Sequence, residues 1–265
     1  MKLDQARVLL TGASGGIGQV MLQALLQAGA QVLGISRQPQ KSTHPRLTWL
    51  QADLTEPQGI SDVARMGAQW QANVLVHAAG LPGFGALPNL STAAIGQVIQ
   101  TNLLTPMLLT QALLPHLQSQ ARAQVVFVGS ALGRIGLPGF SVYGASKAGL
   151  HGFAEALRRE LAGSSVRIQT LAPRSTRTGF NSAEAERYNQ ATGTAVDTPE
   201  TVAQALLKLI ESQAAEQFIG WPERLAVRLN GALGPLLDGS FTKHRQALAQ
   251  ATPHTHQPIP QGTQP

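Results

Sequence analysis

The sequence predicts an α/β protein in which one parallel, doubly wound sheet is covered by helices on both faces. Short apolar runs, typical of buried parallel strands, alternate along the chain with segments of helical periodicity. A glycine-rich loop stands between the first of these runs and the first helical segment. With 265 residues and 43% hydrophobic content, the chain can bury a large core within one domain of ordinary size.

The first predicted strand, residues 8–10, leads through the glycine-rich loop of residues 11–18 (TGASGGIG) into a helix. Gly12 allows a tight turn, Gly16 a close approach of the backbone to a ligand, and Gly18 the packing of the helix on the sheet. Such a loop offers backbone N–H groups and the positive end of a helix to a phosphate. Glycine-rich turns are common in proteins, but this one lies between a strand and a helix, which predicts a nucleotide site.

The second predicted strand, residues 31–35, ends at Ser36 and Arg37. In dinucleotide sites an acid at this place holds the ribose hydroxyls, whereas an Arg accommodates a 2′-phosphate. The chain therefore favours NADP over NAD, unless Arg37 is simply a solvated surface residue. The third predicted strand, residues 47–54, carries Asp53 near its end. Its carboxylate either accepts a hydrogen bond from an adenine amino group or caps the next helix.

A weak helical pattern over residues 59–70 precedes the fourth predicted strand, residues 74–76, which is followed by small residues that would let a flat cofactor lie close. After a Gly/Pro-rich loop, a long helix is predicted over about residues 92–117, and Pro106 should kink or break it. Asn102 lies in the middle of this largely apolar helix and needs hydrogen-bond partners. It is either a site residue or a structural hydrogen-bonding group.

The fifth predicted strand, residues 125–128, ends just before Ser130, and a helix over about residues 143–161 follows. Tyr143 and Lys147 are four residues apart and share one face of that helix. An ammonium beside a phenol favours the phenolate, so we expect Lys147 to lower the pKa of Tyr143 toward working pH. Such a Tyr can exchange a proton with a substrate, and Ser130 can reach the same point. The alternative is an amphipathic helix with a packed Tyr and a solvated Lys.

The sixth predicted strand, residues 166–171, is followed by a polar segment, residues 174–196, expected to be a mobile loop or a pair of short helices that covers the substrate. A helix to about residue 212 and a short strand, residues 217–220, complete the domain. Residues 221–250 form a C-terminal amphipathic extension, expected to pack on its own domain, on a second subunit or on a membrane surface. Residues 251–265 are expected to be a disordered tail, with His254 and His256 solvated.

Composition narrows the functional classes. The net charge of +6 is not gathered into a Lys/Arg run, so no nucleic-acid partner is expected. The absence of Cys excludes disulfides and thiolate chemistry, and no metal site is expected. The N-terminus does not read as a signal peptide and no segment approaches the length of a membrane span, so we expect a cytoplasmic protein.

Together these motifs resemble those of the short-chain dehydrogenase/reductase family, over about residues 7–220. The loop of residues 11–18 matches the family's cofactor glycine motif, and Asp53 matches its adenine-side acid. Pro173 and Thr178 match its Pro-Gly-x-x-x-Thr motif near the nicotinamide. The catalytic tetrad is matched in order and spacing by Asn102, Ser130, Tyr143 and Lys147.

The resemblance implies a single Rossmann-fold catalytic domain over residues 1–220 and hydride transfer between NADP(H) and a small-molecule alcohol or ketone, including hydroxyacyl or 3-oxoacyl substrates. Tyr143 would be the proton donor and acceptor, Ser130 would orient the substrate oxygen, and Lys147 would hold the cofactor ribose. Asn102 would position a water that links Lys147 to solvent. The resemblance implies cofactor contacts at Gly12, Ser14, Gly15, Gly16, Ile17, Gly18, Arg37, Asp53, Leu54, Ala79, Gly80, Tyr143, Lys147, Pro173 and Thr178. A homodimer or homotetramer is expected, as is usual in the family.

Two departures from the family pattern leave alternatives open. The usual Asn-Asn-Ala-Gly segment reads His77-Ala78-Ala79-Gly80, and His77 is either a hydrogen-bonding substitute or merely buried. Arg174 replaces the Gly after Pro173. Its side chain either contacts an acidic substrate or the cofactor pyrophosphate, or simply faces solvent. Ala78 and Arg174 leave room for an NADP-binding regulatory or scaffold protein that does not catalyse. The stretch of residues 221–237 and the net positive charge leave room for a membrane-surface reductase of a lipid-like or carrier-bound acyl substrate.

Overall fold

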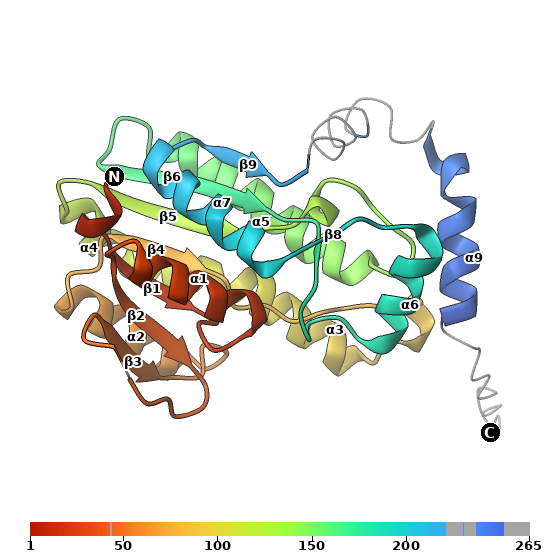
Figure 1. The fold of residues 1–265 in the computed structure, drawn as a ribbon, viewed down its shortest axis with the longest axis horizontal. Helices are drawn as coiled ribbons and strands as arrows, with labels where there is room; N and C mark the ends of the chain where they lie inside the picture. The colour runs from red at the N-terminus through yellow and green to blue at the C-terminus, as the bar shows by residue number, and fades with distance from the viewer. Residues whose placement is uncertain (43, 221–229, 231–236, 252–265) are drawn as a thin grey trace, which may run out of the picture.

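A seven-stranded sheet forms the centre of the molecule in a computed structural model that describes residues 1–42, 44–220, 230 and 237–251 (Figure 1). Its strand order is β3-β2-β1-β4-β5-β6-β9, and every neighbouring pair is parallel. This confirms the predicted doubly wound sheet and places the reversal of strand order between β1 and β4. The strands are β1 (Arg7–Thr11), β2 (Gln31–Ser36), β3 (Leu47–Gln51), β4 (Val74–His77), β5 (Ala123–Val128), β6 (Val166–Ala172) and β9 (Glu216–Phe218).

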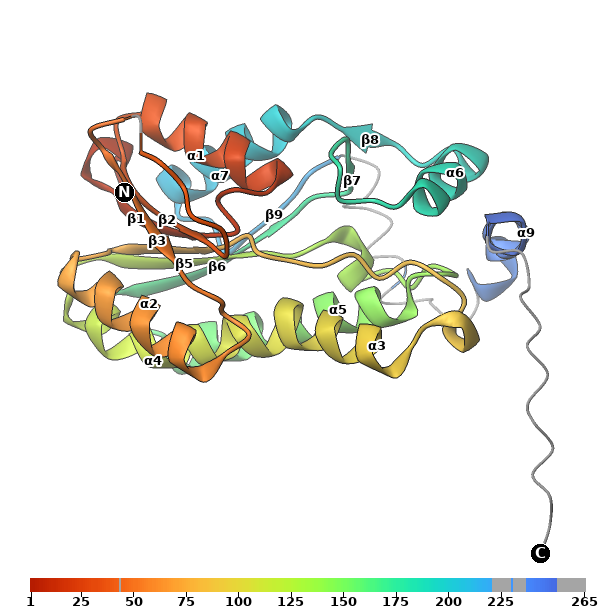
Figure 2. The ribbon, with the colours of Figure 1, turned by 90° about the horizontal axis from the view of Figure 1, so that it is seen from below.

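Helices cover both faces of the sheet, as Figure 2 shows. One face carries α1 (Gly16–Gln27) and α7 (Pro199–Ser212), which contact each other. The opposite face carries α2 (Pro57–Gln69), α3 (Thr92–Ile99), α4 (Thr105–Ser119) and α5 (Ser141–Glu160). No helix within the described ranges is both long enough and apolar enough to cross a membrane.

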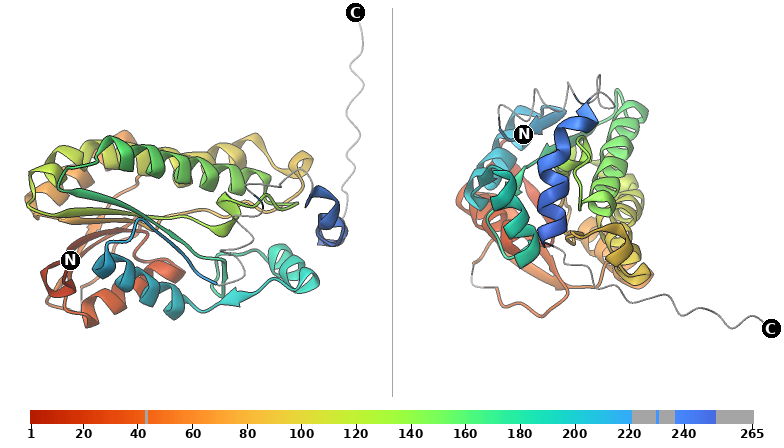
Figure 3. Two further views of the ribbon diagram at one scale, coloured as in Figure 1. Left: turned by 90° about the horizontal axis from the view of Figure 1, so that it is seen from above. Right: turned by 90° about the vertical axis from the view of Figure 1, so that its right-hand side faces the viewer.

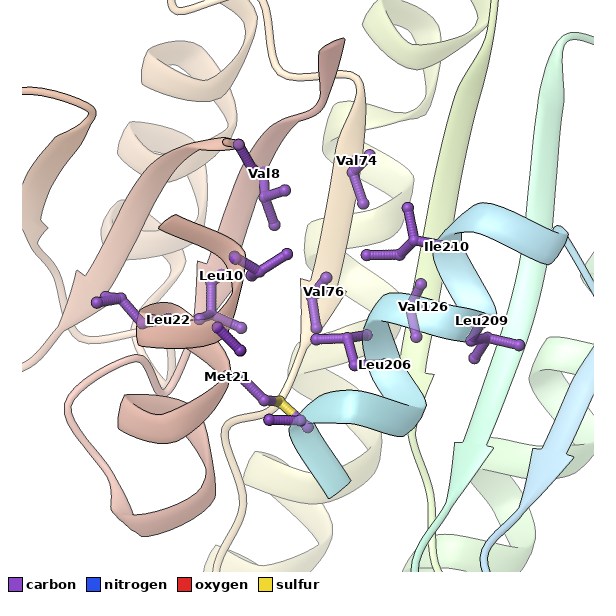
Figure 4. Packing of buried hydrophobic residues seen from close by; sticks show 14 of the residues in the cluster. Val8, Leu10, Met21, Leu22, Val74, Val76, Val126, Leu206, Leu209 and Ile210 are labelled. Atoms are coloured by element: carbon purple, nitrogen blue, oxygen red, sulfur yellow. The ribbon is translucent and has the colours of Figure 1, made fainter. Parts of the chain in front are cut away.

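The central strands are apolar on both sides because each side meets a helix layer. Val8 and Leu10 of β1 pack with Val76 of β4 against α1 and α7 (Figure 4). Leu9, which lies between Val8 and Leu10, belongs to the second core under α2, α4 and α5, together with Phe127 of β5. This two-sided burial explains why these strands read as continuous apolar runs rather than as alternating patterns.

The helix predicted over residues 92–117 is divided into three parts. Helix α3 ends at Ile99, a π-helical turn follows over Gln100–Leu104, and α4 begins at Thr105. Pro106 is the second residue of α4, directly after the π-helical turn, and the backbone before it stays in the right-handed helical region, so the helix changes type here without ending. The widened turn carries Asn102, and π-helical insertions of this kind are frequent at functional sites.

The polar segment predicted as a loop or short helices is ordered around a small parallel pair of strands. β7 (Ser175–Thr176) pairs with β8 (Val196–Asp197), and α6 (Ala183–Thr192) lies between them in the sequence. A further helix, α9 (Thr242–Ala251), was not predicted; it contacts α6 at one end of the molecule (Figure 3). The first part of the predicted amphipathic extension, up to residue 236 except for Asn230, and the tail after residue 251 lie outside the described residues.

Candidate active site

A cavity of about 700 Å³ lies outside the carboxyl ends of the parallel strands. Its wall includes the residues that directly follow β1, β3, β4, β5 and β6, together with Ser36 at the end of β2. In open α/β sheets this is where ligands bind, at the point where strand order reverses. Every residue that the sequence assigned to the cofactor lines this cavity, as do Ser130, Tyr143 and Lys147; Asn102 lies behind its wall.

The glycine loop is held close to the loop after β4. Gly12 has φ +67°, and a Cβ there would lie 2.7 Å from the Cα of Ala79. A Cβ on Gly18 would lie 2.0 Å from the carbonyl oxygen of Gly12, so only glycine allows this helix to begin so near the strand. The N-cap residue Gly15 supplies no side-chain cap, and the first N–H groups of α1 are therefore available to an anion at the cavity.

Thr178 lies against this helix start although it is far away in the sequence. A Cβ on Gly16 would come within 2.8 Å of the Thr178 Cβ. The Thr178 hydroxyl accepts a hydrogen bond from the Phe180 N–H at 3.3 Å. The segment after β6 and the glycine loop therefore enclose one part of the cavity together.

Arg37 and Asp53 line the opposite end, beyond β2 and β3. Asp53 accepts hydrogen bonds from the Thr55 hydroxyl at 2.7 Å and the Thr55 N–H at 2.9 Å. These bonds, with a smaller contribution from the nearby Arg37 charge, lower the pKa of Asp53. The N-cap residue of α2 is Glu56, so Asp53 does not cap that helix. A hydrogen bond from an adenine amino group to Asp53 stays a prediction.

Ser130, Tyr143 and Lys147 come together at the other end of the cavity. Ser130 is the second residue after β5, and its hydroxyl oxygen accepts a hydrogen bond from the Leu132 N–H at 3.1 Å. Tyr143 lies in the first turn of α5 and is hydrogen-bonded to Ser130. Lys147, one turn later, donates to the carbonyl oxygen of Val128 at 3.0 Å, and its Nζ lies 5.8 Å from the centre of the Tyr143 ring.

The expected lowering of the Tyr143 pKa is wrong. Burial raises the pKa of Tyr143 to about 12, and the hydrogen bond from Ser130 opposes this only in part. Burial also lowers the pKa of Lys147 to about 8. The ammonium donates a hydrogen bond to the Val128 carbonyl, and desolvation is the largest effect on the pKa of both groups.

Asn102 connects the π-helical turn to the site without entering the cavity. It is completely buried, and its Oδ1 accepts the Leu81 N–H at 2.8 Å. Its Nδ2 donates to the Leu81 carbonyl at 3.0 Å and to the Ser146 hydroxyl at 3.2 Å. A Cβ on Gly80 would lie 3.4 Å from Asn102 Oδ1 and 3.9 Å from Lys147 Nζ. Asn102 therefore holds the loop after β4 beside the Lys147 ammonium; its link to a water stays a prediction.

The two departures from the family pattern have structural partners. His77 is buried, stacks on Phe127, and shares a hydrogen bond of 2.9 Å with the Thr110 hydroxyl. Burial lowers the pKa of His77 to about 3, so it is a neutral hydrogen-bonding group. Arg174 forms two hydrogen bonds with Asp197, at 2.9 Å and 2.8 Å. It borders the cavity, but its guanidinium is bound to a carboxylate of the protein's own chain.

The sequence did not predict several residues at the site. Phe84, Phe140 and Phe180 line the cavity beside Tyr143, and His244 reaches it from α9. These residues occur in loops or in the extension, where no periodicity marks them. One signal could have indicated them: large apolar rings such as Phe84 in a polar or Gly/Pro-rich loop tend to be buried against the rest of the protein.

His151 was missed as well. It is buried on α5 one turn after Lys147, and its Nε2 lies 3.4 Å from the carbonyl oxygen of Ser130. Its Nδ1 lies 3.5 Å from Oε1 of Glu216 on β9. His151 therefore supports the Ser130 turn from the side opposite the cavity.

The arrangement fits a dinucleotide. The uncapped start of α1 and the glycine loop are placed for the pyrophosphate. Arg37 and Asp53 lie at the end of the cavity expected for the adenosine. Tyr143, Ser130 and Lys147 lie at the other end. Tyr143 with Ser130 can exchange a proton with a substrate oxygen near the same point.

Comparison with known proteins agrees with this geometry. The family model described as short chain dehydrogenase matches residues 6–189. A ketoacyl reductase, HetN, of Nostoc sp. is 31% identical over 224 residues, which are 80% of this chain and 77% of that protein. A short chain dehydrogenase of Burkholderia cenocepacia, solved with NADP, has a TM-score of 0.80 at 23% identity and covers 91% of this chain and 99% of its own. One of Burkholderia phymatum, solved with NAD, has a TM-score of 0.79 at 18% identity, over 89% and 96% of the two chains. This chain belongs to the short-chain dehydrogenase family.

Proposed function

We propose that this oxidoreductase transfers a hydride between NADP(H) and a ketone or secondary alcohol, with Ser130, Tyr143 and Lys147 as catalytic residues. The observation that carries the proposal is the convergence of these three side chains at one end of a cavity whose other end carries Arg37. When bound, the nicotinamide supplies the hydride to the carbonyl carbon or accepts it from the alcohol carbon.

Each residue has a role that its contacts support. The Leu132 N–H occupies a lone pair of the Ser130 hydroxyl, and the Ser130 O–H turns from the Tyr143 phenol to the substrate oxygen when substrate binds. The phenol of Tyr143, protonated at neutral pH, gives its proton to that oxygen during reduction and takes it back during oxidation. Lys147 in its charged form favours the resulting phenolate, and Asn102 keeps the adjoining loop in place.

Arg37 supports NADP as the cofactor. It is exposed at the cavity, while its neighbour Ser36 offers a hydroxyl instead of a carboxylate to the adenosine ribose. A guanidinium at this place can pair with a 2′-phosphate. The two similar structures hold NADP in one case and NAD in the other, so the fold accepts either and the side chains decide.

The name of the Nostoc relative supports oxoacyl compounds among the candidate substrates. We also infer a homo-oligomer, because Leu104, at the end of the π-helical turn, and Leu108, one turn later on α4, are 40% and 36% exposed. The membrane-surface alternative rests on residues 221–237, nearly all of which lie outside the described residues.

Replacing Tyr143 with Phe tests the function. The ring contacts with Phe140 and Phe180 would remain, whereas the proton donor would be lost. We expect NADPH-dependent reduction of a responsive ketone to fall about a hundredfold or more, with NADPH affinity nearly unchanged. Equal turnover by both proteins would refute the mechanism. NADPH binding without hydride transfer to any member of a broad carbonyl panel would favour the non-catalytic alternative.

A further inference from the structure

The part of the cavity beyond Tyr143 is built from aromatic rings. Tyr143 contacts Phe180 at 6.2 Å and Phe140 at 6.4 Å between ring centroids, and Phe140 contacts Phe84 at 5.0 Å. All four rings line the cavity, and Leu132, Ile135, Leu137, Leu237 and Phe241 extend the same apolar wall. A ligand body placed here would contact these rings and aliphatic side chains.

The charged side chains that line the cavity either lie away from this aromatic part or form an ion pair within the protein. Arg37 and Asp53 are at the adenosine end, and Lys147 belongs to the catalytic group. Arg174 is held by both carboxylate oxygens of Asp197. Among the described lining residues, the substrate side therefore presents no charge that would compensate a buried carboxylate or phosphate.

His244 is one of the polar residues among this part of the lining, together with the amide side chains of Asn181, Asn189 and Asn230. Tyr188 is only 1% exposed, so its hydroxyl must donate to a protein acceptor, and Nδ1 of His244 lies 2.7 Å away. Burial lowers the pKa of His244, which keeps its ring neutral. A neutral ring that accepts at Nδ1 carries its proton on Nε2. His244 thus borders the cavity with one hydrogen-bond donor to offer.

The position of His244 is fixed by packing. Ala247 and Ala251 of α9 form a buried cluster with Phe140 and Tyr188, and Phe84 and Leu248 pack against it. Figure 3 shows α9 at the end of the molecule, between α6 and the layer formed by α3 and α5. The helix that carries His244 is thereby attached to both walls of the aromatic region.

We propose that the substrate is an uncharged, largely apolar carbonyl compound with a second oxygen that accepts a hydrogen bond from Nε2 of His244. This deepens the proposed function and rests on it for the position of the reacting carbonyl. The aromatic wall binds the carbon skeleton, and His244 selects, among apolar ketones, those that carry an ester, ether or second carbonyl oxygen. We expect an ionised carboxylate in the same place to bind less well, because Arg174, the cation that the described lining residues supply on this side, is already paired with Asp197.

The test uses the full chain loaded with NADPH and three matched ligand series: methyl-ketone methyl esters of increasing chain length, alkyl ketones of the same lengths, and the corresponding free carboxylates. Binding is measured by calorimetry on the Tyr143→Phe protein, and kcat/KM on the parent. At the best length we expect the ester to exceed the alkyl ketone about three- to tenfold, the value of one neutral hydrogen bond. The carboxylate should be the weakest of the three.

Variants on α9 identify the group responsible. His244→Leu should reduce the ester preference to about one while leaving the alkyl ketone within about twofold. Gln246→Leu, at an exposed position of the same helix that does not border the cavity, should preserve the preference. Tyr188→Phe should weaken it, because the tautomer of His244 is then no longer fixed.

An ester preference that survives in His244→Leu, or a carboxylate that binds as well as its ester, would overturn this proposal. Selective binding without turnover by the parent would overturn the proposed function and leave the ligand class standing. Melting temperatures of the variants show whether α9 remains docked. If His244→Leu undocks it, Tyr188→Phe provides the deciding comparison, and an unchanged preference there counts against the proposal.

Discussion

Arg174 and Asp197 form a two-point ion pair, with Nε to Oδ2 at 2.9 Å and Nη2 to Oδ1 at 2.8 Å, that joins the segment after β6 to β8. The Asp197 side chain is 8% exposed, and the Arg177 N–H donates to its backbone carbonyl at 2.9 Å. Arg174, which replaces a glycine of the family pattern, thus anchors the β7–β8 strand pair. This strand pair precedes α7, and its strand β7 borders the cavity.

Removing one member of this pair should destabilise the protein strongly. In Arg174→Met the Asp197 carboxylate would remain buried without its cation, which typically costs about 3–5 kcal/mol. Chemical denaturation should show this loss in the free energy of unfolding. The double variant Arg174→Met/Asp197→Leu, which leaves no buried charge, should recover most of it. As a control, Glu155→Ala breaks the Arg159–Glu155 pair on the surface of α5 and should cost below about 1 kcal/mol. Equal losses in the single and double variants would show that the pair itself is not what stabilises this region.

Lys147 should give the reaction a pH limit. Its pKa of about 8 means that the ammonium is charged below that pH and lost above it. Reduction at saturating NADPH should therefore be constant below about pH 7 and decline above about pH 8, because the developing phenolate of Tyr143 loses its neighbouring charge. The Lys147→Arg side chain stays charged over this range, so the rate of this slower variant should not decline above about pH 8. If the rate of Lys147→Arg declined over the same pH range, the titration would belong to another group.

The same burial links Lys147 to stability. Between pH about 8 and 10.5 the unfolded chain keeps the Lys147 proton and the unliganded folded protein does not. The unfolded state then binds more protons, so this residue makes the free energy of unfolding rise with pH across that window. Denaturation curves of the parent and of Lys147→Met should diverge there, and parallel curves would contradict the lowered pKa.

Arg37 should determine cofactor preference. A charge-assisted contact to the 2′-phosphate is worth about 1.5–3 kcal/mol, so Arg37→Ala should lose NADPH affinity tenfold or more and NADH affinity little. Arg65→Ala is a suitable control because Arg65 lies on α2, pairs with Asp62 and does not border the cavity. Equal losses of NADPH and NADH affinity in Arg37→Ala would show that Arg37 does not bind the phosphate.

His151 should act on catalysis through Ser130. Its ring packs against both glycines beside that residue: a Cβ on Gly129 would lie 2.9 Å from its Nε2, and one on Gly133 2.8 Å from its Cδ2. His151→Leu should lower kcat about tenfold by displacing the Ser130 hydroxyl. The KM for NADPH should change little, and His151→Gln should restore part of the rate. A matching loss of NADPH binding would point to a general structural defect instead.

The order of strands and helices could be predicted because it depends on local patterns. The buried runs around Leu9 and Phe127 and the glycine loop are properties of a few adjacent residues, and parallel strands with intervening helices leave few ways to arrange them. The irregularity of the helix next to Pro106 was marked by the chemistry of proline. The π-helical form of the turn at Asn102 was not, because it depends on packing against Leu81 and Ser146.

By itself, the sequence determined which residues border the cavity: Gly12, Arg37, Ser130, Tyr143 and Lys147 all do. The tertiary structure decided what their surroundings do to them. Burial reversed the expected pKa shift of Tyr143, and Asp197, distant in the sequence, neutralised Arg174. Helix α9, which no periodicity marked, brought His244 to the aromatic wall. Solvation and charge pairing depend on all the atoms within a few ångströms, and most of those atoms come from residues far apart along the chain.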